Sequence, residues 1–241
     1  MNHPSLVTEK LLRSRDFWWL IGYIQGDGFV DTVGREEIRL TSVDYDLINE
    51  SKRLIHSLFG LEPKVHEERH NPPLKTQVRL AVYSKKLVSW LIQLGLEFGM
   101  RQWNVPKLPK DLFCPYLAGL FDGEGYIYSI LNKVRQRKIR FVAICSTNKL
   151  SLERVLEKLA EFRVKSSMLE RRRRTHYDYE LRLTGLANLK WFIENVGVHS
   201  RLPRKRRLLR EKNLPRRNAP KNGVRRKRTT NRLRWKRPPP L

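Results

Sequence analysis

The chain contains two near-copies of one ten-residue segment, and this repeat constrains the fold more than any other feature. The first copy spans residues 19–28 (WLIGYIQGDG) and the second spans residues 116–125 (YLAGLFDGEG), 97 positions later. Each copy is an apolar run with two glycines four residues apart, and it ends with an acid between glycines. Such a duplication predicts that the chain is built from two similar units.

The glycine spacing predicts two helices in close contact. Residues four apart lie on one face of a helix, so Gly22 with Gly26, and Gly119 with Gly123, form bare stripes. A glycine in a helix interior costs roughly 1 kcal/mol relative to alanine, so the stripes need a packing reason. The usual reason is the close approach of a second helix. Because the neighbouring residues are apolar on nearly every side, we expect the paired helices in the centre of the core.

Both helices carry signals at their ends. Ser14 and Asp111 are also 97 apart and are favoured N-cap types, which predicts that each caps a helix. Pro115 would lie in a first helical turn, where proline is tolerated. We expect Gly28 and Gly125 to end the helices in the left-handed conformation.

The acids Asp27 and Glu124 fall where the two helices end. If the helices pair along their glycine stripes, two carboxylates and two helix carboxyl ends come together, and their repulsion favours a bound cation. Oxygen ligands of this kind suit Mg²⁺. Gln25 and Asp122 lie two residues earlier, about 200° away around the helix, so they cannot share the direction of the acids. For a single copy, buried helices with solvated terminal acids would be the better interpretation; two copies in register favour a cation site.

The similarity extends beyond the motif into a longer unit. After each motif the pattern predicts a hairpin, an amphipathic helix, a second hairpin and a short helix. This order gives an α+β fold of two αββαββα units, at residues 10–103 and 104–211. The expected elements after the motif are 29–42, 44–59, 63–69 with 77–83 and a helix with Trp90 in the first unit, then 126–145, 148–162, 164–173 with 177–184 and a helix with Trp191 in the second.

Alternation along the strands predicts one polar face on each sheet. In residues 35–41, Ile38 and Leu40 face one way and Glu37, Arg39 and Thr41 the other. Arginine on such a face can read guanine in the major groove, and glutamine can read adenine. For any one of these residues, an ordinary solvated sheet face is an equally good interpretation. Glu37 could accept a hydrogen bond from a cytosine amino group, or it could simply face water. The expected DNA contacts are Arg35, Glu37, Arg39, Gln77, Arg79, Lys138, Arg140, Arg171, Arg173 and Arg182.

The charge of the chain points to a polyanionic partner. Its 50 Lys and Arg against 24 Asp and Glu give a net charge of +26. From residue 201 onward we count 18 basic residues and one acid, so this segment carries +17 and the remainder +9. Phosphate contacts would make binding steeply salt-dependent. Residues 204–211 are expected to form a short helix, and the basic tail 212–241 to be disordered, as a nucleic-acid arm or a solvated extension.

Other residue types exclude several classes of protein. No secretory signal or membrane-spanning run is present, so we expect an intracellular protein, cytoplasmic or organellar, with no membrane partner. We also expect a monomer. Cys114 and Cys145 lack metal-ligand spacing and are expected to be reduced. The six histidines form no cluster, so no catalytic role is assigned to them.

Residues 10–210 resemble the LAGLIDADG homing endonucleases. That family is named after the motif helix, whose eighth letter is Asp27 in one copy and Glu124 in the other. Single-chain members carry the motif twice, as here. The resemblance implies a saddle of two antiparallel sheets, related by a pseudo-twofold axis, around the paired helices. It also implies metal-dependent cleavage of both strands, across the minor groove of a long, asymmetric DNA site.

The resemblance assigns roles at the matching positions. Asp27 and Glu124 would be the catalytic metal ligands, and the carbonyls of Gly26 and Gly123 could add further ligands. Lys85 matches the basic residue that the family often places beside each cleavage site, although a solvated helix-start lysine explains it equally well. The second unit has Leu186 at the matching position, so the two sites would be unequal.

Rival functions share this fold or composition. Relatives of the family include maturases, which would bind intron RNA, and a non-catalytic DNA-binding regulator is a further alternative. Composition alone would also allow a ribosome-associated protein. Because loss of an acid would favour a non-cleaving protein and both acids are present, we expect a Mg²⁺-dependent endodeoxyribonuclease that acts on double-stranded DNA.

Overall fold

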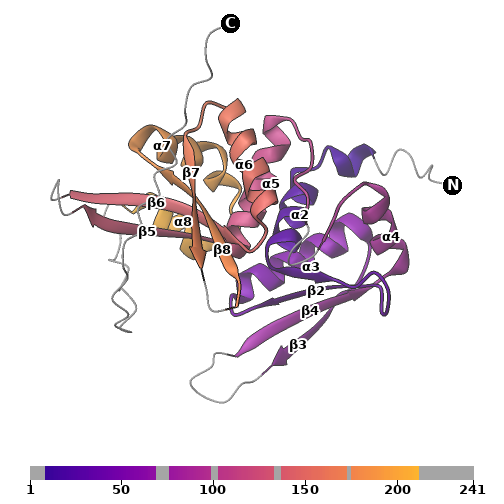
Figure 1. Cartoon of the computed structure of the whole chain (residues 1–241). Helices are drawn as coiled ribbons and strands as arrows, with labels where there is room; N and C mark the ends of the chain where they lie inside the picture. The colour runs from indigo at the N-terminus through magenta and orange to yellow at the C-terminus, as the bar shows by residue number, and fades with distance from the viewer. Residues whose placement is uncertain (1–8, 69–75, 99–102, 133–136, 173–174, 212–241) are drawn as a thin grey trace, which may run out of the picture.

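The computed structural model describes residues 9–68, 76–98, 103–132, 137–172 and 175–211 (Figure 1). Helix α2 (Arg15–Asp27) and helix α5 (Lys110–Glu124) lie side by side in the centre, with one sheet on each side of the pair. Nearly all of both helices is buried, from Phe17 to Gln25 in α2 and from Phe113 to Asp122 in α5. The predicted position of the motif helices in the core is confirmed.

The two helices touch through their glycines. A Cβ atom added to Gly22 would lie 2.0 Å from the carbonyl oxygen of Tyr116, and one added to Gly119 would lie 2.0 Å from that of Trp19. Both contacts are backbone contacts, and their partners are themselves 97 residues apart, as expected for a pseudo-twofold axis. A Cβ at Gly26 would meet only ordinary contacts at 3.5 Å. The first glycine of each stripe therefore sets the distance between the helices.

Each unit contributes one antiparallel sheet with the same strand order, which confirms the duplicated α+β fold. The first sheet has the order β1 (Gly28–Val30), β2 (Glu37–Ser42), β4 (Gln77–Tyr83) and β3 (Lys64–Glu68). The second has the order β5 (Gly125–Asn132), β6 (Arg137–Ser146), β8 (Tyr177–Thr184) and β7 (Ser166–Arg172). Further helices are α3 (Tyr45–Phe59), α4 (Lys85–Gln93), α6 (Lys149–Glu161), α7 (Leu186–Asn195), η1 (Gly197–His199) and α8 (Pro203–Arg210).

The helices cover one face of each sheet and bury its apolar side chains. Leu40 and Leu80 are fully buried in the first sheet, and Val142 and Leu183 are fully buried in the second. These positions pair directly across the ladders, which fixes the face that each strand turns toward the core.

Two predicted signals at the start of α5 are wrong. The Ser14 hydroxyl accepts from the Phe17 N–H at 3.3 Å, so this N-cap is confirmed. Helix α5, in contrast, begins at Lys110 after Pro109, so Asp111 lies inside its first turn and does not cap it. Pro115 consequently lies in the interior of α5, where it cannot donate a helical hydrogen bond.

The two glycines that follow the acids do not have the left-handed conformation that was predicted. Gly28 and Gly125 have φ values of −96° and −87° and are extended, not left-handed. They are required by space, because a Cβ would lie 2.6 Å from the Ile24 carbonyl oxygen in one case and 2.2 Å from the Phe121 ring in the other. The chain can thus turn directly from each motif helix into the first strand of its sheet.

Several predictions concern residues and boundaries that the structure does not define. The basic tail 212–241 and Arg173 lie outside the described residues, and the unit boundaries at 103 and 211 stay predictions. The expected short helix after residue 203 is present as α8. None of the helices in the described ranges is long and apolar enough to span a bilayer.

The close contact makes a stability prediction. Replacing Gly22 with alanine should lower the free energy of unfolding by about 3 kcal/mol, because the new methyl group would overlap a backbone carbonyl that cannot move away. Gly26→Ala is the matched control. It should leave stability unchanged or raise it by up to about 1 kcal/mol, since only helix propensity changes. Urea unfolding of both variants measures the difference, and equal destabilisation would contradict this packing.

Candidate metal and nucleic-acid site

The paired helices bring the two motif acids together. Asp27 is the last residue of α2 and Glu124 is the last residue of α5. The Asp27 Cβ lies 3.1 Å from the point where a Cβ on Gly123 would stand, one residue before Glu124. Both acids are exposed, although the helices that carry them are buried. The structure therefore places the two acids at the same end of the helix pair.

The surroundings disfavour two negative charges at this place. Partial desolvation raises the pKa of Asp27 to about 6, with the positive charge of Lys205 opposing the increase. Desolvation also raises the pKa of Glu124 to about 7, and the nearby charge of Asp27 adds to the increase. A bound cation would relieve this repulsion.

Lys205 is a member of this site that the sequence analysis missed. It lies on α8 with only 3% of its surface exposed, and its Nζ donates to the carbonyl oxygens of Phe121 at 2.5 Å and Asp122 at 2.8 Å. Burial lowers the pKa of Lys205 to about 8. A signal was available, because Leu202, Lys205 and Leu209 recur at helical spacing and all are buried. The surrounding run of arginines hid it.

The sixth-letter residues hold the two helices together. The Trp19 indole of α2 donates to Asp122 of α5 at 3.0 Å, and the Tyr116 hydroxyl of α5 donates to Gln25 of α2 at 2.8 Å. Trp19 and Tyr116 are 97 residues apart, so these hydrogen bonds are also related by the pseudo-twofold axis. Asp122 additionally accepts from the Ser200 hydroxyl at 2.6 Å. As predicted, neither sixth-letter residue shares the direction of the acids.

Arg201, which lies just before α8, and Arg204, which lies in its first turn, tie the second unit to the first. Arg201 pairs with Asp16 on α2 and with Glu50 on α3. Arg204 forms a two-pronged pair with Asp44, the residue before α3, at 2.6 and 3.0 Å. These contacts, of which the Arg204–Asp44 pair is bidentate, hold α8 against the first unit.

On the first sheet, the uncovered face carries arginines that are already paired with acids. Arg39 pairs with Glu37 and lies 5.1 Å from the Phe29 ring centre. Arg79 pairs with Glu68 at 2.6 Å. Glu37 itself is buried with 1% of its side chain exposed, so the expectation that it contacts DNA is contradicted. It orients Arg39 instead.

The second sheet has a stronger version of this arrangement around Glu180, which is fully buried. Its carboxylate pairs with Arg171 and Arg182 and accepts from the Tyr128 hydroxyl at 2.9 Å. Although burial alone would raise it, hydrogen bonds from Arg182 and Tyr128 hold the pKa of Glu180 below its usual value. The predicted face is correct for Arg182, which lies over the Phe141 ring.

The predicted face is wrong for Arg140. Arg140 lies two residues before Val142 on β6, so both side chains face the same side of the sheet. Val142 pairs with the core residue Leu183, and Arg140 therefore lies on the helix-covered side. Its guanidinium donates to the last turn of α8, at Leu208 and at 2.7 Å to Leu209. Lys138 is two residues before Arg140 and alternates onto the same side of the strand, although its side chain lies outside the described residues. The error arose because Phe141, an apolar residue, belongs to the uncovered face.

The remaining predicted contacts are scattered. Arg35 is exposed in the loop before β2, and Gln77 begins β4 at the uncovered face of its sheet. Both stay candidates for DNA contact.

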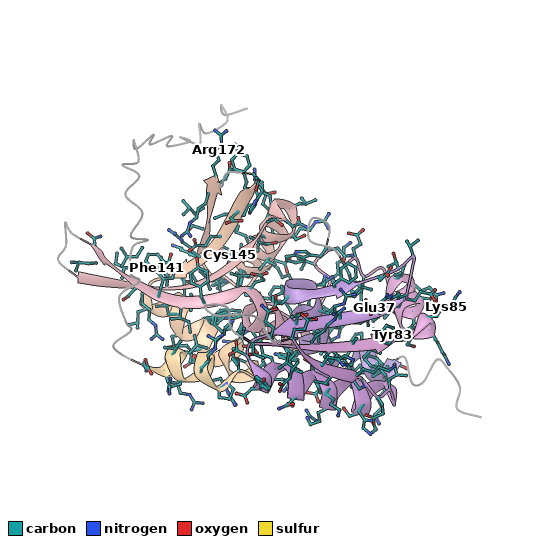
Figure 2. The ribbon with its side chains drawn as sticks, turned by 90° about the horizontal axis from the view of Figure 1, so that it is seen from below. Glu37, Tyr83, Lys85, Phe141, Cys145 and Arg172 are labelled. Carbon is teal, nitrogen blue, oxygen red and sulfur yellow. The ribbon has the colours of Figure 1, made fainter. Side chains whose placement is uncertain are left out.

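Lys85 does not join the acids. Gly28, next to Asp27, pairs with Leu40, whereas Tyr83 pairs with Glu37 three residues farther along β2. Three strand residues span roughly 10 Å, and Lys85 lies beyond that point. Figure 2 shows Lys85 at the outer end of the first unit, where it is 79% exposed and lies 3.6 Å from Glu36. This geometry favours the interpretation of a solvated helix-start lysine.

Comparison with known proteins establishes the family. The LAGLIDADG-like domain matches twice, over residues 15–94 and 114–197. This chain belongs to the LAGLIDADG family. Its two matched segments each contain one motif helix and one sheet, so it is a single-chain, two-motif member.

Solved LAGLIDADG structures share the fold. The homing endonuclease I-DmoI, in complex with DNA and Ca, is 21% identical with a TM-score of 0.52, and the likeness covers 81% of this chain and 96% of that one. The N-terminal LAGLIDADG domain of WhiA is 16% identical with a TM-score of 0.52, covering 80% and 88%. Full-length WhiA from Thermatoga maritima is 16% identical with a TM-score of 0.53, covering 89% and 68%.

One curated relative is a much longer protein. The glutamine–fructose-6-phosphate aminotransferase (isomerizing) of Methanocaldococcus jannaschii is 29% identical over 130 residues. The match covers 52% of this LAGLIDADG chain but only 11% of the aminotransferase. The name of that protein therefore describes a chain of which this one spans about a tenth.

The acid pair makes a prediction about stability and pH. Asp27 and Glu124 have folded pKa values of about 6 and 7 against ordinary values of 3.8 and 4.5, so the folded state binds more protons. Stability should fall as pH rises from about 4 to 7. A double variant, Asp27→Asn with Glu124→Gln, should be more stable than the parent at pH 8 by on the order of 1 kcal/mol, a figure discounted for solvent exposure. Thermal unfolding with a chelator should show this advantage disappearing near pH 4; a constant offset would contradict it.

A second prediction concerns Glu180. Glu180→Gln should lower the free energy of unfolding by roughly 3 kcal/mol, because it leaves two arginines and a buried site without their counter-charge. The control is Glu68→Gln, which removes a partly exposed pair with Arg79 and should cost less than about 1 kcal/mol. Denaturant titration compares them, and a similar small cost for both would refute a central role for Glu180.

Proposed function

We propose that this LAGLIDADG protein is a site-specific endonuclease that makes a double-strand break in a long, asymmetric DNA target. The observation that carries the proposal is the meeting of Asp27 and Glu124 at the ends of two helices that pack through glycine. A structural role alone explains the glycines, but it does not explain two exposed acids held at a place that disfavours their charge.

The donor set at this place fits a hard divalent cation such as Mg²⁺. Asp27 and Glu124 would hold it, and the carbonyls of Gly26 and Gly123 are the nearest further oxygen ligands in sequence. Within the described residues no cluster of three or more His, Cys, Asp or Glu side chains forms a closed metal site. Two carboxylates with open positions suit Mg²⁺, which commonly completes its shell with water and substrate phosphate. When bound, such an ion activates a water and stabilises the charge of the phosphodiester during hydrolysis.

The protein's own residues would hold and read the duplex. Arg39, Arg79, Arg171 and Arg182 lie on the uncovered faces of the two sheets, each fixed by a neighbouring glutamate. A fixed guanidinium loses less conformational entropy when it binds a base edge or a phosphate. Since the chain carries +26, we also expect binding to weaken steeply with salt.

A second candidate is DNA binding without cleavage, and one observation favours it. Lys85 lies away from the acids, so no basic residue predicted from the family stands beside Asp27. A maturase that binds folded intron RNA stays a third alternative, without a geometric feature in its favour.

The test is cleavage of a plasmid that carries the sequences flanking this reading frame, joined without it. Parent protein with Mg²⁺ should yield a linear product, whereas Asp27→Asn or Glu124→Gln should lower the rate by roughly 10³-fold or more, because each removes a metal ligand. Both variants should still bind the plasmid in a gel-shift assay, which is the control for folding. Tight binding by the parent protein without a linear product would reject the nuclease in favour of the regulator, and a preference for folded intron RNA would favour the maturase.

A further inference from the structure

A lysine buried beside a pair of carboxylates is the least expected feature of this molecule. Lys205 belongs to α8, which follows the duplicated pattern of helices and strands. The residue 97 positions earlier is Leu108, a buried apolar residue. The charge therefore has no counterpart at the position that the 97-residue repeat makes equivalent, and duplication of the fold does not account for it.

The ammonium group of Lys205 is directed at the end of helix α5. The last carbonyl groups of a helix lack intrahelical partners and carry a partial negative charge. Lys205 donates to two such carbonyls, those of Phe121 and Asp122, which immediately precede Gly123 and Glu124. A buried positive charge thus neutralises part of the negative end of the motif helix α5.

The charges around this group are mixed but predominantly acidic. Asp122, Asp27 and Asp44 interact with Lys205 electrostatically, and Arg204 is the neighbouring cation. The positive charge of Lys205 in turn favours the ionised carboxylates of Asp27 and Glu124. A fixed positive charge beside two metal ligands weakens the binding of a second cation by Coulomb repulsion.

We propose that Lys205 is a positioning residue that acts as an internal cation of the acid site and competes with a divalent metal. The proposal rests on the proposed function, in which Asp27 and Glu124 hold that metal. In the DNA-free protein the ammonium stabilises the end of α5 and the acid pair. A divalent cation consequently binds weakly until the phosphates of a bound duplex add their negative charge.

The alternative is a role in stability alone. Lys205 also packs its ammonium 5.0 Å from the Phe121 ring centre, and α8 is held by Arg140 at its other end. If Lys205 only anchors α8, its removal will lower stability without changing the affinity for metal.

The experiment measures Mn²⁺ binding to the full-length, DNA-free protein by the loss of the free-ion electron paramagnetic resonance signal. Lys205→Gln keeps a hydrogen-bond donor and removes the charge, and Lys205→Met removes both. Each should lower the Kd for Mn²⁺ by about tenfold, as expected for loss of one nearby charge. The matched control is Arg206→Gln, which removes one charge from an exposed position on the same helix and should change the Kd less than about twofold.

The outcomes separate this inference from the proposed function. An unchanged or higher Kd in folded Lys205→Gln, as judged by circular dichroism, overturns the inference while leaving the nuclease proposal standing. If Mn²⁺ binding by the parent and by both Lys205 variants is no greater than binding by Asp27→Asn, the acid pair holds no metal and both proposals fail. Tighter binding in the two Lys205 variants that is lost again on adding Asp27→Asn supports the inference.

Discussion

The contact of glycine with a backbone carbonyl, made twice across a pseudo-twofold axis, is the constraint on which the rest of the molecule depends. Gly22 lies against Tyr116 and Gly119 lies against Trp19, so the two motif helices approach more closely than side chains would allow. This proximity makes possible the reciprocal hydrogen bonds to Asp122 and Gln25. It also places the last residues of both helices at one point. Two buried helices therefore end in two exposed acids. A sheet begins at the residue after each acid, and the two sheets lie on either side of the helix pair.

The two units are alike in fold and unlike in chemistry. Arg201 and Arg204, near the end of the second unit, pair with acids of the first, and α8 places Lys205 against the end of α5. The uncovered sheet faces also differ, since Glu37 pairs with Arg39, whereas Glu180 organises Arg171, Arg182 and Tyr128. Under the proposed function, this difference suits an asymmetric target, because each sheet can present its own set of fixed guanidinium groups.

Local signals in the sequence predicted the order of elements and the meeting of the acids, because a duplicated pattern supplies each signal twice. The failures at Arg140 and Lys205 share one physical cause, which is that local spacing does not report what covers a residue. Arg140 alternates correctly with Phe141, but α8 covers the arginine and leaves the phenylalanine on the uncovered face. Lys205 belongs to a run of cations, and only the packing of α8 buries it. Lys85 matched a family position by counting, whereas the register of β4 on β2 places it past Tyr83, away from the end of β1 that follows Asp27.

The central claim is that the carboxyl ends of α2 and α5 touch, and a disulfide across that contact tests it most directly. The Asp27 Cβ and the position of a Cβ on Gly123 are 3.1 Å apart, slightly closer than the Cβ separation of an unstrained disulfide. The variant pair Asp27→Cys with Gly123→Cys, in a chain whose Cys114 and Cys145 are replaced by alanine, should lose both free thiols under mild oxidation. Asp27→Cys with Lys85→Cys, in the same background, should keep them. Two titratable thiols in the first pair, in a folded and oxidised sample, would show that the helices do not meet and would remove the basis for a shared acid site.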